Sequence, residues 1–266
     1  MKRGLGPLET QLLAYAQMRG LPTLRVGEHR GPLRLSAIQE RKLLNRMARA
    51  GLLSRVWRGL YLVPPRLPLG GKWSPDEALA LSALMTSQEA RYQVCGPNAF
   101  NRYGFETQVP NRVYAYNDRI SGERTVGAVA LTLIKVGIER LGETEKALTA
   151  DGLTTLYSSR ARTLVDAVYD WSRFNGLPRA FEWIRAELAE ERVGAADLVR
   201  ITLRYGDVGT IRRIGALLDR EGVPDTLLRR LLRALKPTTG LIAWNPVRPR
   251  RGTVDRRWGV VWNDRA

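Results

Sequence analysis

The sequence has one cysteine, Cys95, and one histidine, His29, among its 266 residues. A single cysteine excludes an internal disulfide. One cysteine and one histidine are also too few ligands for a zinc site built from these two residue types. We therefore expect no metal and no other cofactor. The sequence also has no G-x-S-x-G motif, which would supply a nucleophile for a catalytic triad with His29. We therefore expect no catalytic residues and a protein that is not an enzyme.

Long apolar runs are missing as well. No stretch approaches the ~18 consecutive apolar residues that a membrane helix requires. The basic first residues precede an amphipathic segment rather than the apolar centre of a signal peptide. We find neither an apolar surface helix nor a lipidation signal that would indicate membrane binding. These features predict a cytoplasmic protein without membrane contact.

Acidic residues are scarce at both ends of the chain. Residues 1–66 contain 13 Lys+Arg against 3 Asp+Glu, residues 67–235 contain 23 against 21, and residues 236–266 contain 7 against 2. The net charge of +17 is therefore concentrated at the two ends. Cations gathered in a small segment are typical of proteins that neutralise nucleic-acid phosphates, so we expect double-stranded DNA as a partner.

Hydrophobic spacing predicts an amphipathic helix over residues 7–20 and a second helix over residues 36–50. Ser36 and Gln39 have the spacing of a capping box at the start of this second helix. Gly51 provides a C-terminal cap. The irregular residues between the helices allow a short further helix, but they do not locate it.

Residues 52–63 have the alternation of a β-hairpin with its tip near residues 55–59. Helix, irregular link, basic helix and basic hairpin follow one another as in a winged helix-turn-helix domain. We therefore predict such a domain over residues 1–66. A linker rich in proline and glycine follows at residues 64–71.

Residues 72–266 predict a larger α+β domain. Ser74 and Pro75 are a helix start, with the serine as cap. Strands are expected at residues 111–118 and 127–137, and the segment 159–235 is helical, with breaks near Gly176, Gly194, Gly206 and Gly222. Two short strands at 241–244 and 258–262 predict a C-terminal β-hairpin. The whole chain is thus assigned to the α+β class.

The helix at 36–50 has a cationic side opposite its apolar side. Leu43, Leu44 and Met47 lie on the apolar side, and Glu40 lies among them, so the cationic side carries no acid. A solvated surface helix is the simpler reading, but the adjoining basic hairpin favours contact with DNA. The candidate DNA-binding residues are Ser36, Gln39, Arg41, Lys42, Asn45, Arg46, Arg49, Arg55 and Arg58.

These candidates divide by chemistry. The first turns of a recognition helix usually read bases and later residues contact the backbone. Amides suit adenine and guanidinium or ammonium groups suit guanine, so Gln39, Arg41, Lys42 and Asn45 are the expected base readers. Arg49, Arg55 and Arg58 are the expected phosphate contacts.

A second basic group lies near the C-terminus. It is compatible with a solvated loop or with a second contact to nucleic-acid phosphates, and both readings stay open. Its members are Arg248, Arg250, Arg251, Arg256 and Arg257.

Two other features carry little functional signal. Asp76, with Glu89 and Arg91, faintly matches a metal-dependent nuclease pattern, but the lysine is missing and a helix start explains Pro75 and Asp76 better. Cys95 follows a valine and is expected to be a small buried side chain.

Several segments in order resemble the AbiEi family of antitoxins from type IV toxin–antitoxin and abortive-infection systems. They are LLNRMARAGLL and VWRGLY at residues 43–53 and 56–61, YQVCGPNAF with YG at 92–104, RTLVD at 162–166, and the closing segment 252–263 with RW and WN. Their order is more specific than any single motif. Together they cover most of the chain.

The resemblance implies a winged-helix repressor of its own toxin–antitoxin operon, one that binds inverted repeats in the promoter and takes part in phage defence. It also implies that the second domain counteracts a nucleotidyltransferase toxin from a neighbouring gene, and direct contact with that toxin is not required. Two alternatives remain: an ordinary regulator whose C-terminal domain binds a ligand or oligomerises, and a nuclease. A neighbouring nucleotidyltransferase gene or metal-dependent nicking of DNA would separate the three.

Overall fold

The computed structural model describes residues 5–66, 72–149 and 152–264. In these ranges the chain is mixed α+β, with eleven α-helices and strands in three sheets, as expected for the α+β class. It divides into two compact units: residues 1–92, 111–138 and 147–155 make unit 1, and residues 93–110, 139–146 and 156–266 make unit 2. None of the helices in the described part is long and apolar enough to span a bilayer. The expected domain boundary at residues 67–71 lies outside the described residues.

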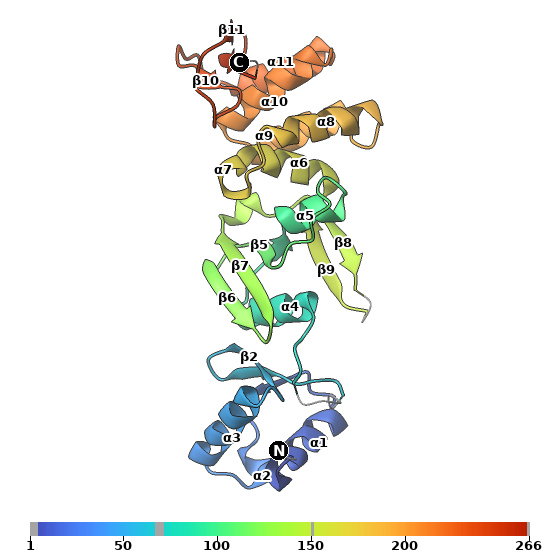
Figure 1. Ribbon diagram of the computed structural model, residues 1–266, viewed down its shortest axis with the longest axis vertical. Helices are drawn as coiled ribbons and strands as arrows, with labels where there is room; N and C mark the ends of the chain where they lie inside the picture. Colours follow the sequence, from blue (N-terminus) through green and yellow to red (C-terminus); the bar gives the residue numbers. More distant parts are fainter. Residues whose placement is uncertain (1–4, 67–71, 150–151, 265–266) are drawn as a thin grey trace. The chain divides into compact units, whose positions relative to one another are not determined.

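Unit 1 begins with three helices and a small sheet (Figure 1, blue). The antiparallel sheet has the order β1-β3-β2. Leu12, Leu24, Leu44, Met47 and Leu62 are almost completely buried between the helices and this sheet. The elements are α1 (Pro7–Met18), β1 (Thr23–Arg25), α2 (Arg30–Leu33), α3 (Ala37–Arg49), β2 (Ser54–Trp57) and β3 (Leu60–Leu62).

The two expected helices and the hairpin are confirmed, with α1 two residues shorter than expected at its C-terminal end. The sequence did not locate α2 or β1. Helix α2 is one turn that contains Gly31 and Pro32, so no periodicity marks it. Strand β1 has three residues, too few for alternation to be recognised.

Unit 1 continues with α4 (Glu77–Ser87), β5 (Val113–Asn117), β6 (Gly122–Val126) and β7 (Val129–Lys135). The cap of α4 differs from the expectation. Asp76, not Ser74, accepts the hydrogen bond from the Leu79 amide at 2.7 Å. Ser74 instead accepts one from the Ala128 amide at 2.8 Å. A carboxylate is a strong cap and its charge favours the helix N-terminus.

Strands β5 and β7 lie within the two expected segments and pair in parallel, whereas β6 was not expected. Four of the five residues of β6 are exposed or half-buried and two are charged, so no apolar alternation reveals it. These strands belong to a sheet of order β6-β7-β5-β4-β9-β8, which includes β4 (Tyr92–Val94), β8 (Thr144–Leu148) and β9 (Thr154–Ser158).

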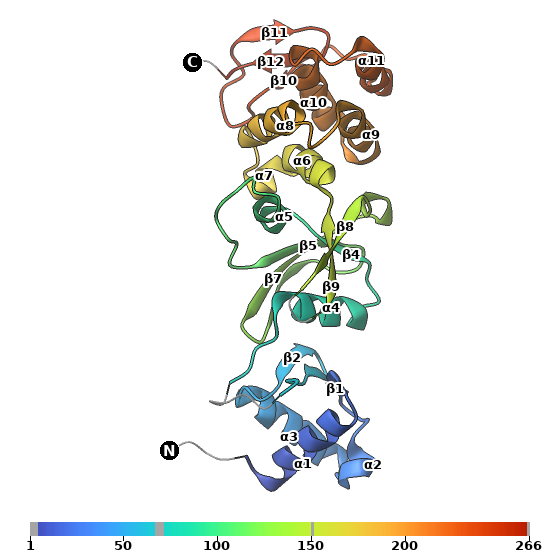
Figure 2. The same ribbon diagram turned by 90° about the vertical axis from the view of Figure 1, so that its right-hand side faces the viewer.

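Unit 2 is mainly helical, and its helices pack side by side (Figure 2). The four glycine-containing breaks expected between residues 159 and 235 all separate helices. The segment before the first of these breaks contains two helices, α6 and a short α7, and the sequence indicated no break between them. The helices are α5 (Pro97–Arg102), α6 (Arg160–Tyr169), α7 (Trp171–Phe174), α8 (Arg179–Ala189), α9 (Ala195–Tyr205), α10 (Val208–Arg220) and α11 (Asp225–Ala234), and a 3-10 turn (Ile138–Arg140) precedes β8.

The last sheet has the order β10-β12-β11, with β10 (Ile242–Ala243), β11 (Thr253–Asp255) and β12 (Val260–Trp262). A C-terminal hairpin is present, but the two strands expected to form it, β10 and β12, run parallel. The antiparallel partner of β12 is β11, which lies in the connection expected to be irregular. Strand β11 has only three residues, two of them exposed, so the sequence shows no strand pattern there.

Helix α10 carries this sheet. A Cβ atom on Gly215 would lie 2.1 Å from the indole of Trp258, so only glycine allows the ring to lie against the helix. Trp258 is 1 % exposed. Arg212 and Arg213 on the same helix donate to backbone carbonyls, among them those of Trp258 at 2.7 Å and Ala243 at 3.0 Å. Burial lowers the pKa of both guanidinium groups.

Candidate nucleic-acid interface

Helix α3 has well-defined ends. The Gln39 amide donates to Ser36 Oγ at 3.2 Å, and the Ser36 amide donates to Gln39 Oε1 at 2.8 Å, which is the expected capping box. At the other end, the Leu52 amide donates to the Met47 carbonyl at 2.9 Å, and Gly51 has φ +77°. This is a Schellman motif, in which glycine takes the left-handed conformation. The helix therefore presents a fixed set of faces.

One side of α3 is buried and holds an acid with a structural role. Glu40 is 1 % exposed and accepts hydrogen bonds from the backbone amides of Gly27 at 2.8 Å and His29 at 3.0 Å. Arg30 also donates to it, at 3.4 Å. The carboxylate thus fixes the turn that leads into α2. The helical pattern puts Glu40 on the apolar side and indicates no role for it, although an acid at such a position is itself a sign of a buried polar contact.

The other side of α3 is exposed, but two of its side chains are engaged. Arg46 forms an ion pair with Glu9 of α1, with Nε and Oε1 2.8 Å apart. Hydrogen bonds from the Gly6 amide and then from Arg46 hold the pKa of the Glu9 carboxyl below its usual value. Tyr61 donates to Asn45 Oδ1 at 2.8 Å, so Asn45 is held against β3.

The remaining cations of α3 are free of acids. Arg41, Lys42 and Arg49 are exposed, and in the described part of the chain no carboxylate lies within ion-pair distance of them. Three acids and eleven basic residues lie in residues 5–66. The acids pair with Arg46, Arg30 and, at 3.9 Å, Arg25. Eight cations in this segment consequently lack a carboxylate partner among the described residues.

The hairpin adds two of these eight. Arg55 and Arg58 are exposed, and Arg58 with Gly59 forms the two-residue turn between β2 and β3. Gly59 has φ +78°, a conformation that favours glycine at this turn. The register shifts between Arg55 and Trp57, and Arg55 Nε donates to the Trp57 carbonyl at 3.4 Å. The hairpin therefore displays one arginine at its tip and a second on its first strand.

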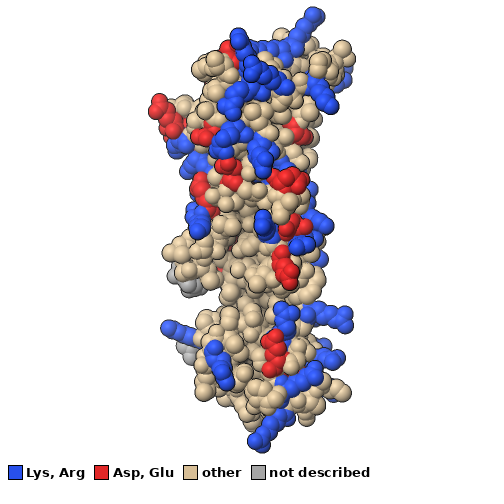
Figure 3. Space-filling view, turned by 180° about the vertical axis from the view of Figure 1, so that it is seen from behind, with Lys and Arg blue, Asp and Glu red and all other residues tan. Residues whose placement is uncertain are grey.

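The charge distribution differs between parts of the surface. Figure 3 shows Lys and Arg with little acid on the visible face of the N-terminal residues (bottom of the view), whereas acids and bases alternate over most of the face of unit 2. Acidic and basic side chains that alternate form local ion pairs, whereas a group of unpaired basic side chains attracts a polyanion.

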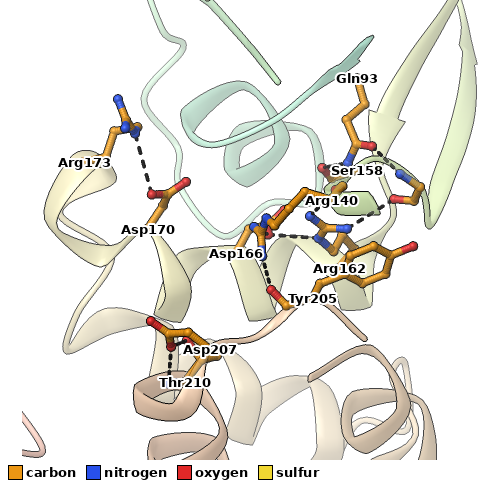
Figure 4. A network of polar contacts seen from close by, with 11 residues as sticks. Gln93, Arg140, Ser158, Arg162, Asp166, Asp170, Arg173, Tyr205, Asp207 and Thr210 are labelled. Carbon is orange, nitrogen blue, oxygen red and sulfur yellow. Dashed lines mark hydrogen bonds and ion pairs between the residues drawn. The ribbon is translucent and has the colours of Figure 1, made fainter. Parts of the chain in front are cut away.

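Unit 2 contains a second polar cluster that deserves comparison (Figure 4). Asp166 is 1 % exposed and accepts from Arg162 Nε at 2.9 Å and Arg140 Nη2 at 3.1 Å. The guanidinium of Arg162 is completely buried, lies 3.7 Å from the centre of the Tyr205 ring and donates to the Arg140 carbonyl at 2.9 Å. Burial raises the pKa of Asp166, against the effect of the two arginines.

The same cluster ties neighbouring segments together. Gln93 Nε2 donates to Ser158 Oγ at 2.8 Å, and Gln93 Oε1 accepts from the Gly142 amide at the same distance. Arg162 and Asp166 are the first and last residues of the RTLVD segment, four apart on α6. Their burial and their partners within unit 2 assign them to the core of this unit rather than to a ligand.

The C-terminal arginines fall into three groups. Arg248 and Arg250 donate to the backbone carbonyls of Asp264 at 2.8 Å and Leu241 at 2.6 Å. Arg257 forms ion pairs with Asp219 at 3.1 Å and with Asp225. Arg251 and Arg256 are exposed. Figure 3 shows Lys and Arg gathered at the end of unit 2 that carries these C-terminal elements (top of the view).

The weak nuclease pattern is not assembled as a metal site. The carboxylate of Asp76 is occupied as the cap of α4. Cys95 is completely buried, as the sequence predicts. Among residues 5–66, 72–149 and 152–264, no three histidine, cysteine or acidic side chains come together as metal ligands.

Comparison with known proteins gives a family match over part of the chain and a similar fold. Residues 35–149 match a family of unknown function, DUF6088. This segment includes α3 and the β2–β3 hairpin. No curated protein matches the chain. Among solved structures, the chain is similar to the RV2827C protein from Mycobacterium tuberculosis, with 13% identity, a TM-score of 0.59, and 97% of this chain and 92% of that chain covered. The likeness extends to the fold.

Proposed function

We propose that residues 5–66 form a winged helix-turn-helix domain that binds double-stranded DNA, with α3 in the major groove and the β2–β3 hairpin as the wing. The observation that carries this proposal is the exposed side of α3, where Arg41, Lys42 and Arg49 have no acidic partner, next to a hairpin with Arg55 and Arg58. Free guanidinium and ammonium groups on adjoining elements can neutralise the phosphates on either side of a groove.

The contacts of each side chain refine its role in this proposal. Arg41 and Lys42 belong to the first half of α3 and are the main candidates for base contacts. Asn45, held by Tyr61, keeps its NH₂ group as donor. Gln39 uses its side-chain oxygen, and Ser36 its hydroxyl, in the capping box. We therefore assign Ser36 and Gln39 to shaping the helix start, and Arg49, Arg55 and Arg58 to phosphates.

We further propose that the protein is a non-enzymatic repressor of its own toxin–antitoxin operon. Support comes from the resemblance of residues 43–61, 92–104, 162–166 and 252–263 to AbiEi antitoxins. In this proposal the protein binds inverted repeats in its promoter and counteracts a neighbouring nucleotidyltransferase toxin, without a need for direct contact.

The experiment for DNA binding uses the full chain on its own upstream DNA and on random duplex. We expect footprints on inverted repeats. Arg41→Ala should cost about 1–3 kcal/mol on the footprinted site and much less on random DNA. Arg58→Ala should weaken both about equally and flatten the salt dependence by about 0.9 in slope. Arg204→Ala, an exposed arginine of α9, is the matched control.

Equal losses on both DNAs for Arg41→Ala would show that α3 does not read bases. Wild-type affinity in both Arg41→Ala and Arg58→Ala would contradict the proposal that α3 and the hairpin bind DNA. A protected upstream site without a neighbouring nucleotidyltransferase gene would favour an ordinary regulator instead.

Antitoxicity is tested separately, again with the full chain. The triple variant Arg49→Gln, Arg55→Gln, Arg58→Gln removes three free cations from residues 5–66 and should abolish repression. If the two activities are separate, this variant still protects cells that express the neighbouring toxin. Protection lost in parallel with DNA binding, at unchanged protein level, would show that antitoxicity needs the DNA contact.

A further inference from the structure

A second group of cations lacks acidic partners at the C-terminal end of unit 2. We call it the C-terminal cationic surface. All of its members are exposed, and among residues 152–264 none has a carboxylate within ion-pair distance. The members are Arg230, Arg233, Lys236, Arg248, Arg250, Arg251 and Arg256.

The fold brings together segments that are separate in the sequence. Arg257, next to Arg256, bonds to Asp225 at the start of α11, which places the turn between β11 and β12 beside the helix of Arg230 and Arg233. Arg250 donates to the carbonyl of Leu241, which places the loop between β10 and β11 beside the segment that follows α11. Figure 3 shows the resulting gathering of Lys and Arg, with little acid among them.

The acids of this region are already occupied. Asp219 accepts from Arg257 and from Trp258 Nε1 at 2.8 Å, and Asp225 pairs with Arg229 at 2.6 Å. Asp255 accepts from the Trp258 amide at 3.1 Å. The nearby carboxylates therefore serve other cations or backbone groups, and the surplus positive charge of the surface stays available for an external anion.

We propose that the C-terminal cationic surface binds the phosphate backbone of duplex DNA without reading sequence. Six of its seven members are arginines, whose planar fork fits phosphate oxygens. The proposal assigns the surface a contact separate from α3, and it holds whether or not α3 reads an operator.

The composition of the surface favours duplex DNA over other polyanions. Single strands are bound by exposed aromatic side chains on which bases stack, but Trp244, Trp258 and Trp262 of this region are 2 %, 1 % and 8 % exposed. A membrane surface would require bulky exposed apolar residues, and here the exposed large apolar side chains of residues 229–264 are Val247 and Val254. A rigid backbone of regularly spaced phosphates needs neither feature.

The test measures the affinity of the full chain for random-sequence duplex against salt concentration. The variant Arg233→Gln, Arg251→Gln, Arg256→Gln should lower the slope of log K against log salt by about 2.7 and weaken binding at least about ten-fold at low salt. The control Lys135→Gln, Lys146→Gln, Arg204→Gln removes the same charge from exposed sites elsewhere and should bind like wild type. An unchanged melting temperature shows that folding is intact.

The variant Arg49→Gln, Arg55→Gln, Arg58→Gln separates this proposal from the proposed function. It should lose only its own share of the slope, and adding the three C-terminal substitutions should lower the slope by a further amount of similar size, about 2.7. If the C-terminal variant binds duplex like its control, the proposal is overturned while the α3 interface can still stand. A loss seen on single-stranded RNA but not on duplex, or on an acidic polypeptide alone, overturns the assignment to duplex DNA.

Discussion

Arginine is used in opposite ways by residues 5–66 and by helices α6 and α10. On α3 and the hairpin, Arg41, Arg49 and Arg58 are exposed and have no acidic partner in the described chain. In unit 2, Arg162 and Arg212 are 0 % and 5 % exposed and bond to a carboxylate or to backbone carbonyls. The same residue type thus leaves unpaired positive charge on the surface in one region and holds a core together in the other.

The difference shows why net charge alone overstates a binding surface. A guanidinium that is buried and bonded to Asp166 or to the carbonyl of Trp258 is out of reach of a phosphate. Even on α3, Arg46 is neutralised by Glu9. Only the cations that remain after internal partners are assigned indicate where a polyanion binds.

The largest effect is expected at Arg162. Arg162→Leu leaves Asp166 buried with Arg140 as its remaining guanidinium partner, and it breaks the bonds to the carbonyls of Arg140 and Gly142. We expect the free energy of unfolding to fall by about 3 kcal/mol or more, because an undercompensated buried charge is costly. Denaturant unfolding measures it. Arg41→Leu is the control, with a change of at most about 0.5 kcal/mol. Equal free energies of unfolding for Arg162→Leu and Arg41→Leu would show that the bonds of Arg162 do not stabilise unit 2.

The second effect concerns the buried acid of residues 5–66. Glu40→Ala removes the acceptor of the Gly27 and His29 amides and should cost about 1.5–3 kcal/mol, the range for hydrogen bonds to a charged group. Duplex binding should weaken with it, because α2 and α3 lose their common turn. Thermal unfolding is the measurement. Glu28→Ala, whose side chain is 59% exposed, changes the charge equally and should be close to neutral. A greater loss at Glu28 would contradict the assignment.

The third effect is local to the start of α3. Ser36→Ala removes the acceptor of the Gln39 amide and should cost about 1 kcal/mol, whereas Ser36→Gly should cost only a few tenths. Denaturant unfolding of the two variants gives the comparison. A base-contacting role for the Ser36 hydroxyl would instead show as a loss of sequence-specific binding without a loss of stability.

The smallest effect is the pH dependence of the Glu9–Arg46 pair. The folded-state pKa of Glu9 lies below its ordinary value of 4.5, so its contribution to stability is present above that value. This contribution is lost as the pH falls through the lower, folded-state pKa. Stability measured from pH 7 to pH 3 should therefore decline less steeply in Glu9→Gln than in wild type. Arg46→Gln should show a partial effect, because the Gly6 amide still donates to Glu9. If stability falls with pH in the same way in wild type and Glu9→Gln, the Glu9–Arg46 pair does not contribute to the stability of the fold.

The sequence by itself determined features that depend on neighbours along the chain. The capping box of Ser36 and Gln39, the glycine end of α3 and the glycine breaks between the helices of unit 2 all lie where local pattern placed them. Each depends on hydrogen bonds and backbone preferences within four or five residues. The concentration of positive charge at residues 5–66 and 236–264 is likewise a property of composition.

Tertiary structure decided which of the charged residues are free. Glu9 and Arg46 are 37 residues apart, and Asp225 and Arg257 are 32 apart, so no periodicity announces either pair. Strand β12 pairs with β11 on one side and with the more distant β10 on the other, and no local pattern shows that β10 runs parallel to it. Burial and partnership arise only when the chain has folded. For that reason the sequence indicated a cationic protein, and the fold selected the cations that face solvent without a partner.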